Sequence, residues 1–146
     1  MILPFLNRDD EKKRLIRLIE NGGGFAVVYG RRRCGKSRLI REILPKESSV
    51  YYVGDEREAP LQRDAFSKEV ARLVHGFDQV IYPDWGSLFD RWWNEAPSKS
   101  CLCIDEFPYL VQVSPEIPSL LQKLIDQCTP ESPSLILSGS SQTMMH

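Results

Sequence analysis

The sequence predicts an α/β fold in which helices cover both faces of a parallel β-sheet. Two short apolar runs, FAVVY at 25–29 and CLCI at 101–104, show no polar alternation and are typical of strands buried on both faces. Segments with helical periodicity separate such runs along the chain. Residues 30–37, GRRRCGKS, follow the first run directly and match the pattern G-x-x-x-x-G-K-[ST], which joins a strand to a helix.

The first half of the chain is expected to alternate helix and strand. A helix is predicted from an N-cap at Asn7 to about Glu20, because acidic residues fill its first turn and the glycines at 22–24 end it. The strand at 25–29 follows, and a second helix is predicted at 36–44, before a proline. The β-forming sequence SVYYV predicts the next strand at 49–53.

The second half continues the same alternation. Apolar residues at helical spacing predict helices at 61–75 and from Trp85 to the residue before Pro97. We interpret Trp85 and Trp92 as core residues, with a base-stacking platform as the alternative. A buried strand is predicted within 100–107, then a helix that begins between residues 115 and 118, then a strand at 134–138.

The 30–37 loop has the residue types that bind phosphate. Between Gly30 and Gly35, successive backbone N–H groups can turn inward and form a concave anion site. The helix that follows directs the partial positive charge of its N-terminus to the same place. Lys36 can reach the β- and γ-phosphate oxygens of a nucleotide, and the Ser37 hydroxyl can ligate a magnesium ion that bridges them.

Acidic residues end the strand within 100–107. Because ligands gather at the carboxyl ends of parallel strands, Asp105 is expected to face the 30–37 loop and to hold the magnesium. Glu106 can accept a proton from the water that attacks the γ-phosphate. Ser140, just past the strand at 134–138, can sense the γ-phosphate or instead cap the next helix.

Bulk composition indicates one globular domain. The chain has 146 residues, of which 42% are hydrophobic and 27% charged, and its net charge is −1. We divide the domain into an N-terminal segment and helix at 1–24 and a nucleotide-binding core at 25–146. The balanced charge gives no global field that would attract DNA.

Cysteine usage and hydropathy predict a cytoplasmic protein. The four cysteines form no C-x-x-C pair and the two histidines suggest no zinc site. No signal peptide opens the chain, and no apolar run approaches the roughly 18 residues of a membrane-spanning helix. We therefore expect reduced thiols and no membrane partner.

Basic residues crowd the 30–37 loop. They form either a solvated surface or a positive funnel for a polyanionic ligand, and both interpretations stay open. Cys34 is either a small residue that fits the loop or an oxidation-sensitive one. The basic residues are Arg31, Arg32, Arg33, Lys36, Arg38 and Arg41.

Together these segments resemble the prokaryotic AAA-like ATPases of the signal-transduction type, a family enriched in archaea. FLNRDDEKKRL is similar to the opening motif of that family and YGRRRCGKSRLI to its Walker A motif. CLCIDEFPYL is similar to its Walker B motif with the adjoining glutamate, and SLILSGSSQTMM to its sensor-1 strand. The resemblance covers essentially the whole chain, in the right order.

The resemblance implies a three-layer P-loop NTPase sandwich of the additional-strand, catalytic-glutamate type. By sequence rank its strands would lie in the order second, third, fourth, first, fifth. Catalytic roles would belong to Lys36, Glu106 and Ser140, and metal binding to Ser37 and Asp105. Residues implied in nucleotide binding are Phe5, Arg8, Gly30, Arg31, Arg32, Arg33, Cys34, Gly35, Lys36, Ser37 and Arg38.

The fifth strand and the helical lid of that family have no counterpart in the sequence. We therefore expect a truncated chain or a fragment, in which the strand at 25–29 forms an uncovered sheet edge. Such an edge invites pairing, so a second copy or a partner chain would complete the sheet.

The sequence thus predicts a magnesium-dependent ATPase that binds ATP, ADP and Mg²⁺, with weak turnover because no arginine finger is identifiable. The alternative is a non-catalytic, nucleotide-dependent switch or scaffold in signalling or DNA-related processes. A degenerate module that binds no nucleotide is a third hypothesis.

Overall fold

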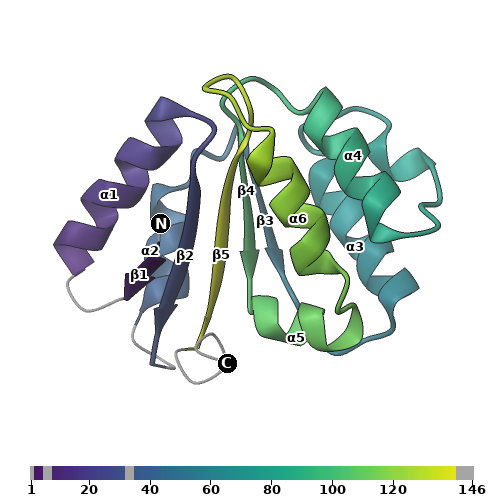
Figure 1. Cartoon of the computed structure of the whole chain (residues 1–146), viewed down its shortest axis with the longest axis horizontal. Coiled ribbons are helices and arrows are strands. Elements are labelled where there is room, and N and C mark those ends of the chain that lie inside the picture. The colour runs from purple at the N-terminus through teal and green to yellow at the C-terminus, as the bar shows by residue number, and fades with distance from the viewer. Residues whose placement is uncertain (1, 5–7, 32–34, 141–146) are drawn as a thin grey trace.

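The computed structural model describes residues 2–4, 8–31 and 35–140. These residues form an α/β fold around a five-stranded sheet in the order β1-β2-β5-β4-β3 (Figure 1). Every pair of neighbouring strands is parallel. The predicted fold class is confirmed.

From the β3 edge to β2, the strands lie in the predicted order, β3-β4-β5-β2. They are β1 (Ile2–Pro4), β2 (Phe25–Gly30), β3 (Ser49–Val53), β4 (Cys101–Asp105) and β5 (Ser134–Ser140). β5 lies between β2 and β4, so one strand separates the strand before the 30–37 loop from the strand that carries the acidic pair. This is the arrangement expected of the additional-strand type.

The expectation of an uncovered edge at β2 is wrong. β1 pairs in parallel with β2, with Ile2 opposite Val27 and Leu3 opposite Val28. Leu3 is 1% exposed and belongs to the core. β1 therefore occupies the place expected for the fifth strand. Pro4 is compatible with this position because an edge strand needs no N–H donor on its outer side.

The helices form two layers, one on each face of the sheet (Figure 1). α1 (Arg8–Asn21) and α2 (Lys36–Ile43) cover one face. The other face carries α3 (Ala59–Val70), α4 (Trp85–Glu95), α6 (Ile117–Asp126) and the 3₁₀ helix η1 (Phe77–Gln79). α5 (Phe107–Val113) follows β4 directly at the carboxyl end of the sheet.

A separate apolar core fills each side of the sheet. Leu15 of α1 and Ile40 of α2 pack on Val28 in the first core. In the second, the Phe66 ring meets the Trp85 ring edge-on, with centroids 5.6 Å apart. Trp85 is 0% and Trp92 1% exposed, which confirms that these tryptophans are core residues.

Some helix boundaries differ from the prediction. α5 was not predicted, and α3 begins at Ala59 and ends at Val70 instead of spanning 61–75. Both helices carry a proline in their first turn, where no N–H is needed. From the sequence alone, a proline in the first turn of a helix cannot be told from a proline in the loop before it, so these helix starts were placed incorrectly or missed.

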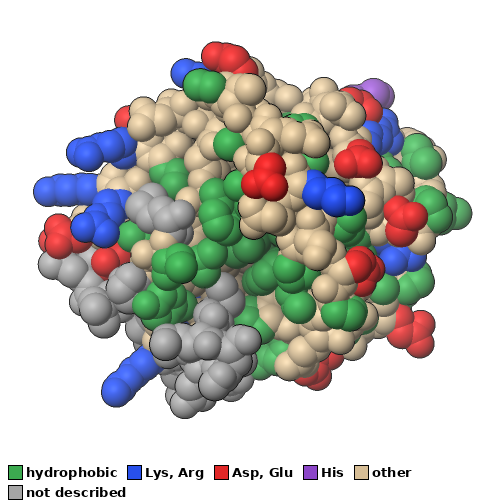
Figure 2. All heavy atoms as spheres, viewed as in Figure 1, with side chains coloured by type: hydrophobic (Ala, Val, Ile, Leu, Met, Phe, Trp, Pro, Cys, Tyr) green, Lys and Arg blue, Asp and Glu red, His purple; other side chains and the backbone are tan. Residues whose placement is uncertain are grey.

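The second face of β2 is less covered than the first. Phe25 and Val27 are half-buried, whereas Ala26 and Val28, which point to α1 and α2, are fully buried. Figure 2 shows apolar side chains across the middle of this view, over β2 and β5 between α1 and α6. Among the described helices, none combines the length and apolar character needed to cross a bilayer.

Candidate functional site

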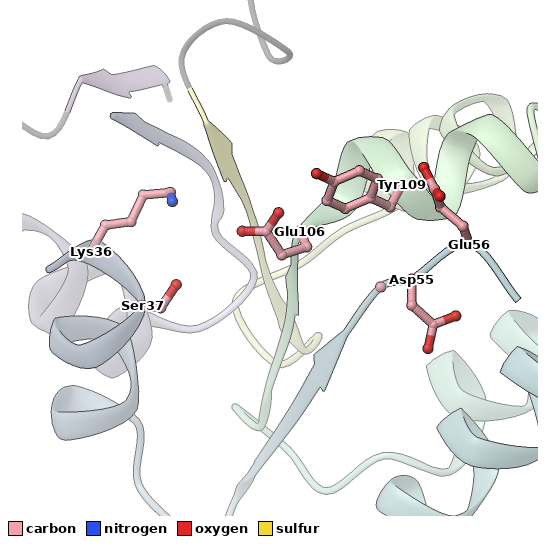
Figure 3. Close-up of a pocket in the computed structure, with 7 residues that line it drawn as sticks. Lys36, Ser37, Asp55, Glu56, Glu106 and Tyr109 are labelled. Atoms are coloured by element: carbon pink, nitrogen blue, oxygen red, sulfur yellow. The ribbon is translucent and has the colours of Figure 1, made fainter. Parts of the chain in front are cut away.

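A pocket of about 620 Å³ opens where the parallel strands end. α2, the loop after β3 and the start of α5 contribute its walls (Figure 3). Its lining residues are Lys36, Ser37, Gly54, Asp55, Glu56, Glu106 and Tyr109.

The first turn of α2 places Lys36 and Ser37 in one wall of this pocket. Gly35 is the N-cap of α2 and has a left-handed backbone, with φ 90°, that favours glycine. Gly35 has no side chain to cap α2, so within the described residues the N–H groups of the first turn stay available to a ligand. Lys36 is only 5% exposed. An ammonium buried at a helix N-terminus fits an anionic ligand.

Asp105 ends β4 and lies directly behind Ser37. Asp105 is 2% exposed, and its carboxylate accepts hydrogen bonds from the hydroxyls of Tyr51 and Ser138. The Glu106 amide donates to Asp105 Oδ1 at 2.9 Å, and the Ser37 hydroxyl is a further hydrogen-bond partner. Burial raises the pKa of Asp105, but these four hydrogen bonds outweigh it and hold the pKa below its usual value. Asp105 is therefore an anion at neutral pH.

Tyr51 remains a hydrogen-bond donor beside this anion. Burial raises the pKa of Tyr51 far above its ordinary value of 10.0, and the hydrogen bond to Asp105 adds to the shift. The guanidinium of Arg41 lies over the Tyr51 ring, 6.0 Å from its centroid.

Glu106 stands between β4 and α5. It has φ 52° and ψ 40°, a left-handed conformation that non-glycine residues adopt rarely. Figure 3 shows its carboxylate directed across the pocket to the side that carries Lys36 and Ser37. The left-handed turn therefore aims this side chain into the pocket while the chain turns into α5.

The loop after β3 forms the pocket wall opposite α2, and Gln62 of α3 holds this loop in place. Gln62, which is 0% exposed, accepts a hydrogen bond from the Asp55 amide at 3.1 Å and donates one to the Arg57 carbonyl at 2.9 Å. The Gly54 amide donates to the Asp105 carbonyl at 2.8 Å. These bonds fix residues 54–57 against the end of β4.

The structure brings several predicted site residues together. Lys36, Ser37 and Glu106 line the pocket, and Asp105 lies directly behind Ser37. Ser140 is buried at the end of β5, where it pairs with Gly30 at the start of the 30–37 loop.

Of the described basic residues near the loop, Lys36 lines the pocket and the arginines lie outside it. Arg31, Arg38 and Arg41 are exposed, and Arg38 pairs with Glu42 at 3.5 Å, as expected of a solvated surface. They are not among the residues that line the pocket. Outside the described residues lie Phe5, Arg32, Arg33, Cys34 and the side chain of Arg8.

Sequence reasoning did not single out Tyr51, Ser138, Asp55, Glu56 or Tyr109. Tyr51 and Ser138 reach Asp105 from the two neighbouring strands, and that contact depends on strand register. Asp55 and Glu56 line the pocket from the polar loop after β3, and Tyr109 lines it from α5, the helix that was not predicted. Their nearness to the ends of predicted strands was the one available signal.

Comparisons with known proteins identify the family. A family model described as an ATPase domain predominantly from Archaea matches residues 5–146. An uncharacterized protein of Methanocaldococcus jannaschii is 31% identical over 143 residues, which make up 97% of this chain. The match spans 30% of the length of that relative. The chain therefore belongs to the family of ATPase domains found predominantly in Archaea, as its motifs predicted.

Proposed function

We propose that this domain binds ATP with magnesium and hydrolyses the β–γ phosphoanhydride bond. Membership in an ATPase family supports nucleotide chemistry in general. The observation that carries the proposal is the contact between Ser37 and the buried, ionised Asp105, at a pocket that also holds Lys36 and Glu106. We assign cation binding to this pair, phosphate binding to the Lys36 ammonium and the role of general base to Glu106.

Phosphate binding is assigned to the 30–37 loop. The Lys36 ammonium and the N–H groups at the start of α2 offer charge and hydrogen bonds to the β- and γ-phosphates. The pocket volume of about 620 Å³ suits a nucleotide.

The donor set fits magnesium. Hydroxyl and carboxylate oxygens are the protein ligands that this cation prefers. Ser37 would hold the ion through its hydroxyl oxygen, and Asp105 would act directly or through water. A hydroxyl that donates its proton to a carboxylate keeps its oxygen lone pairs for a cation. When bound, magnesium neutralises charge on the phosphate oxygens.

Glu106 is proposed as the general base. Its carboxylate faces the side of the pocket that carries Lys36 and Ser37 (Figure 3). From there it accepts a proton from the water molecule that attacks the γ-phosphate. Tyr109 of α5 also lines the pocket.

Two substitutions test this assignment. Calorimetry should show that Lys36→Ala loses ATP affinity, and a steady-state phosphate-release assay should show that Glu106→Gln loses turnover while it keeps ATP. Lys46→Ala and Glu116→Gln, at exposed positions outside the pocket, serve as matched controls. Absence of ATP binding by the wild-type domain, or equal binding by Lys36→Ala, contradicts the proposal.

A nucleotide-dependent switch is the second candidate. Glu106, in the pocket, is the N-cap of α5, and Ser114 is its C-cap. The Ser114 hydroxyl accepts a 3.0 Å hydrogen bond from the Trp85 indole in the core. A change at Glu106 can therefore move a core residue. Under this function, Glu106→Gln retains a nucleotide-dependent change in tryptophan fluorescence, and the wild-type domain binds ATP without measurable turnover.

A further inference from the structure

We infer that Tyr51 and Ser138 are positioning residues that clamp the Asp105 carboxylate from its two sides and so fix it for the magnesium nucleotide. The inference rests on the proposed magnesium-ATP function and extends it to residues on β3 and β5. Three neighbouring strands would then build the metal half of the site.

Strand register places all three side chains on one face of the sheet. Tyr51 pairs with Cys103, and Val53 pairs with Asp105. Because side chains alternate along a strand, Tyr51, Cys103 and Asp105 point to the same side. On β5, Ile136 pairs with Cys103, so Ser138 shares that side as well. It is the side covered by α1 and α2, and Ser37 lies in the first turn of α2.

The two hydroxyls hold different carboxylate oxygens. Tyr51 donates to Asp105 Oδ2, whereas Ser138 donates to Oδ1. The Glu106 amide also donates to Oδ1, at 2.9 Å. A carboxyl group turns readily about its last side-chain bond, and donors on both oxygens restrict that rotation. The face of Asp105 presented to Ser37 is consequently fixed.

The clamp is itself held in place. Ser138 is 0% exposed, so its hydroxyl has no competing water. The Tyr51 ring is half-buried and lies under the Arg41 guanidinium, 6.0 Å from the ring centroid. Hydrogen-bond partners of metal-binding carboxylates orient those ligands, and their removal typically lowers metal affinity roughly 10- to 100-fold.

The decisive measurement is the ratio of ATP dissociation constants in EDTA and in magnesium. In the wild-type domain this ratio reports the gain in affinity that magnesium provides. Tyr51→Phe and Ser138→Ala should each leave the affinity in EDTA unchanged and reduce the magnesium gain roughly 10-fold or more. Ser138→Thr, which keeps the hydroxyl, should restore the gain.

Tyr52→Phe is the matched control. Tyr52 is the next residue on β3, points to the opposite face, and its hydroxyl bonds to Gln62 instead of Asp105. The substitution removes the same atom from the same strand, and it should leave the magnesium gain intact. A further check is the Asp105→Asn background, where adding Tyr51→Phe should have no additional effect on the gain.

The outcomes separate the clamp from the function beneath it. A wild-type domain with no magnesium gain overturns the proposed magnesium-ATP function. A wild-type gain that Tyr51→Phe and Ser138→Ala both retain overturns the clamp alone. Equal losses in EDTA and magnesium also overturn it, because they indicate a purely structural role. If Tyr51→Phe does not fold, the clamp is tested by the two Ser138 variants: a magnesium gain lost in Ser138→Ala and kept in Ser138→Thr supports it, and equal gains in the two variants overturn it.

Discussion

Glu106 adopts a left-handed backbone conformation at the point where β4 ends and α5 begins. Among the described residues that are not glycine, Lys99 also has a positive φ, at 60°. For residues with a Cβ atom this conformation costs roughly 1–2 kcal/mol. The strain at Glu106 is explained by its position, because it directs the carboxylate into the pocket.

Glu106→Gly should separate stability from function. Glycine relieves the left-handed strain, so we expect the free energy of unfolding to rise by up to about 1 kcal/mol while ATP turnover is lost. Urea unfolding and a phosphate-release assay measure the two effects. Lys99→Gly, outside the pocket, should give a similar rise with turnover unchanged. A fall in stability for Glu106→Gly alone would mean that its side chain contributes more than the strain removes.

Tyr52 should make the fold sensitive to alkaline pH. Burial raises the pKa of Tyr52 to about 12, against an ordinary value of 10.0. The folded state therefore favours the neutral phenol, and its contribution is fully present below pH 10 and lost as pH rises from 10 to about 12. At most about 3 kcal/mol depends on this shift. Urea unfolding between pH 9 and pH 11.5 should show a shallower loss in Tyr52→Phe; equal slopes would refute the prediction.

At the scale of elements, the loop after β3 and the start of α5 are packed so closely that only glycine fits between them. A Cβ atom at Gly54 would lie 2.8 Å from the Glu106 carbonyl oxygen and 3.1 Å from Leu110 Cβ. The two pocket walls therefore depend on one residue that has no side chain.

Gly54→Ala should move these walls apart. Forcing a methyl group into this contact is expected to lower the free energy of unfolding by about 1–3 kcal/mol and to reduce turnover, since Glu106 shifts with its carbonyl. Gly86→Ala, in α4, is the control. The added Cβ atom would lie 3.5 Å from Asp84 Oδ1 and 3.6 Å from Leu120 Cδ2, which are ordinary contacts, and alanine should stabilise α4 by up to about 1 kcal/mol. Unchanged stability and turnover in Gly54→Ala would show that the contact relaxes freely.

Local sequence signals predicted most elements and missed those that depend on distant partners. The runs at 25–29, 49–53, 101–104 and 134–138 all form strands, because their apolar or β-forming character is visible in the run itself. β1 has three residues and a proline, too few to show any period. It is a strand only because β2 offers a free edge beside it.

The same division holds for the site. The spacing of the 30–37 loop and the acidic pair after a buried strand are local patterns, so the sequence alone singles out Lys36, Ser37, Asp105 and Glu106 as candidates. Tyr51 and Ser138 contact Asp105 through cross-strand register over more than 30 residues of sequence. No pattern within either strand specifies which partner strand lies alongside.

At the scale of the whole molecule, β1 closes the sheet on the side of the 30–37 loop. Leu3→Ala should lower the free energy of unfolding by about 2–4 kcal/mol, because Leu3 is 1% exposed and packs in the core shared by α1 and α2. Ile2→Ala, on the same strand but 69% exposed, should change it by less than about 0.5 kcal/mol. Thermal and urea unfolding of both variants measure the difference, and equal effects would show that β1 adds little to the fold.

The pairing of β2 with β5 has a consequence for synthesis on the ribosome. β2 carries the loop that we assign to phosphate binding, yet its partner strand begins at Ser134, and the Gly24 amide bonds to the Ser134 hydroxyl 110 residues further along the chain. Contacts of such high sequence separation form late and slowly. A nascent polypeptide would thus acquire nucleotide affinity only after β5 has left the exit tunnel and entered the sheet.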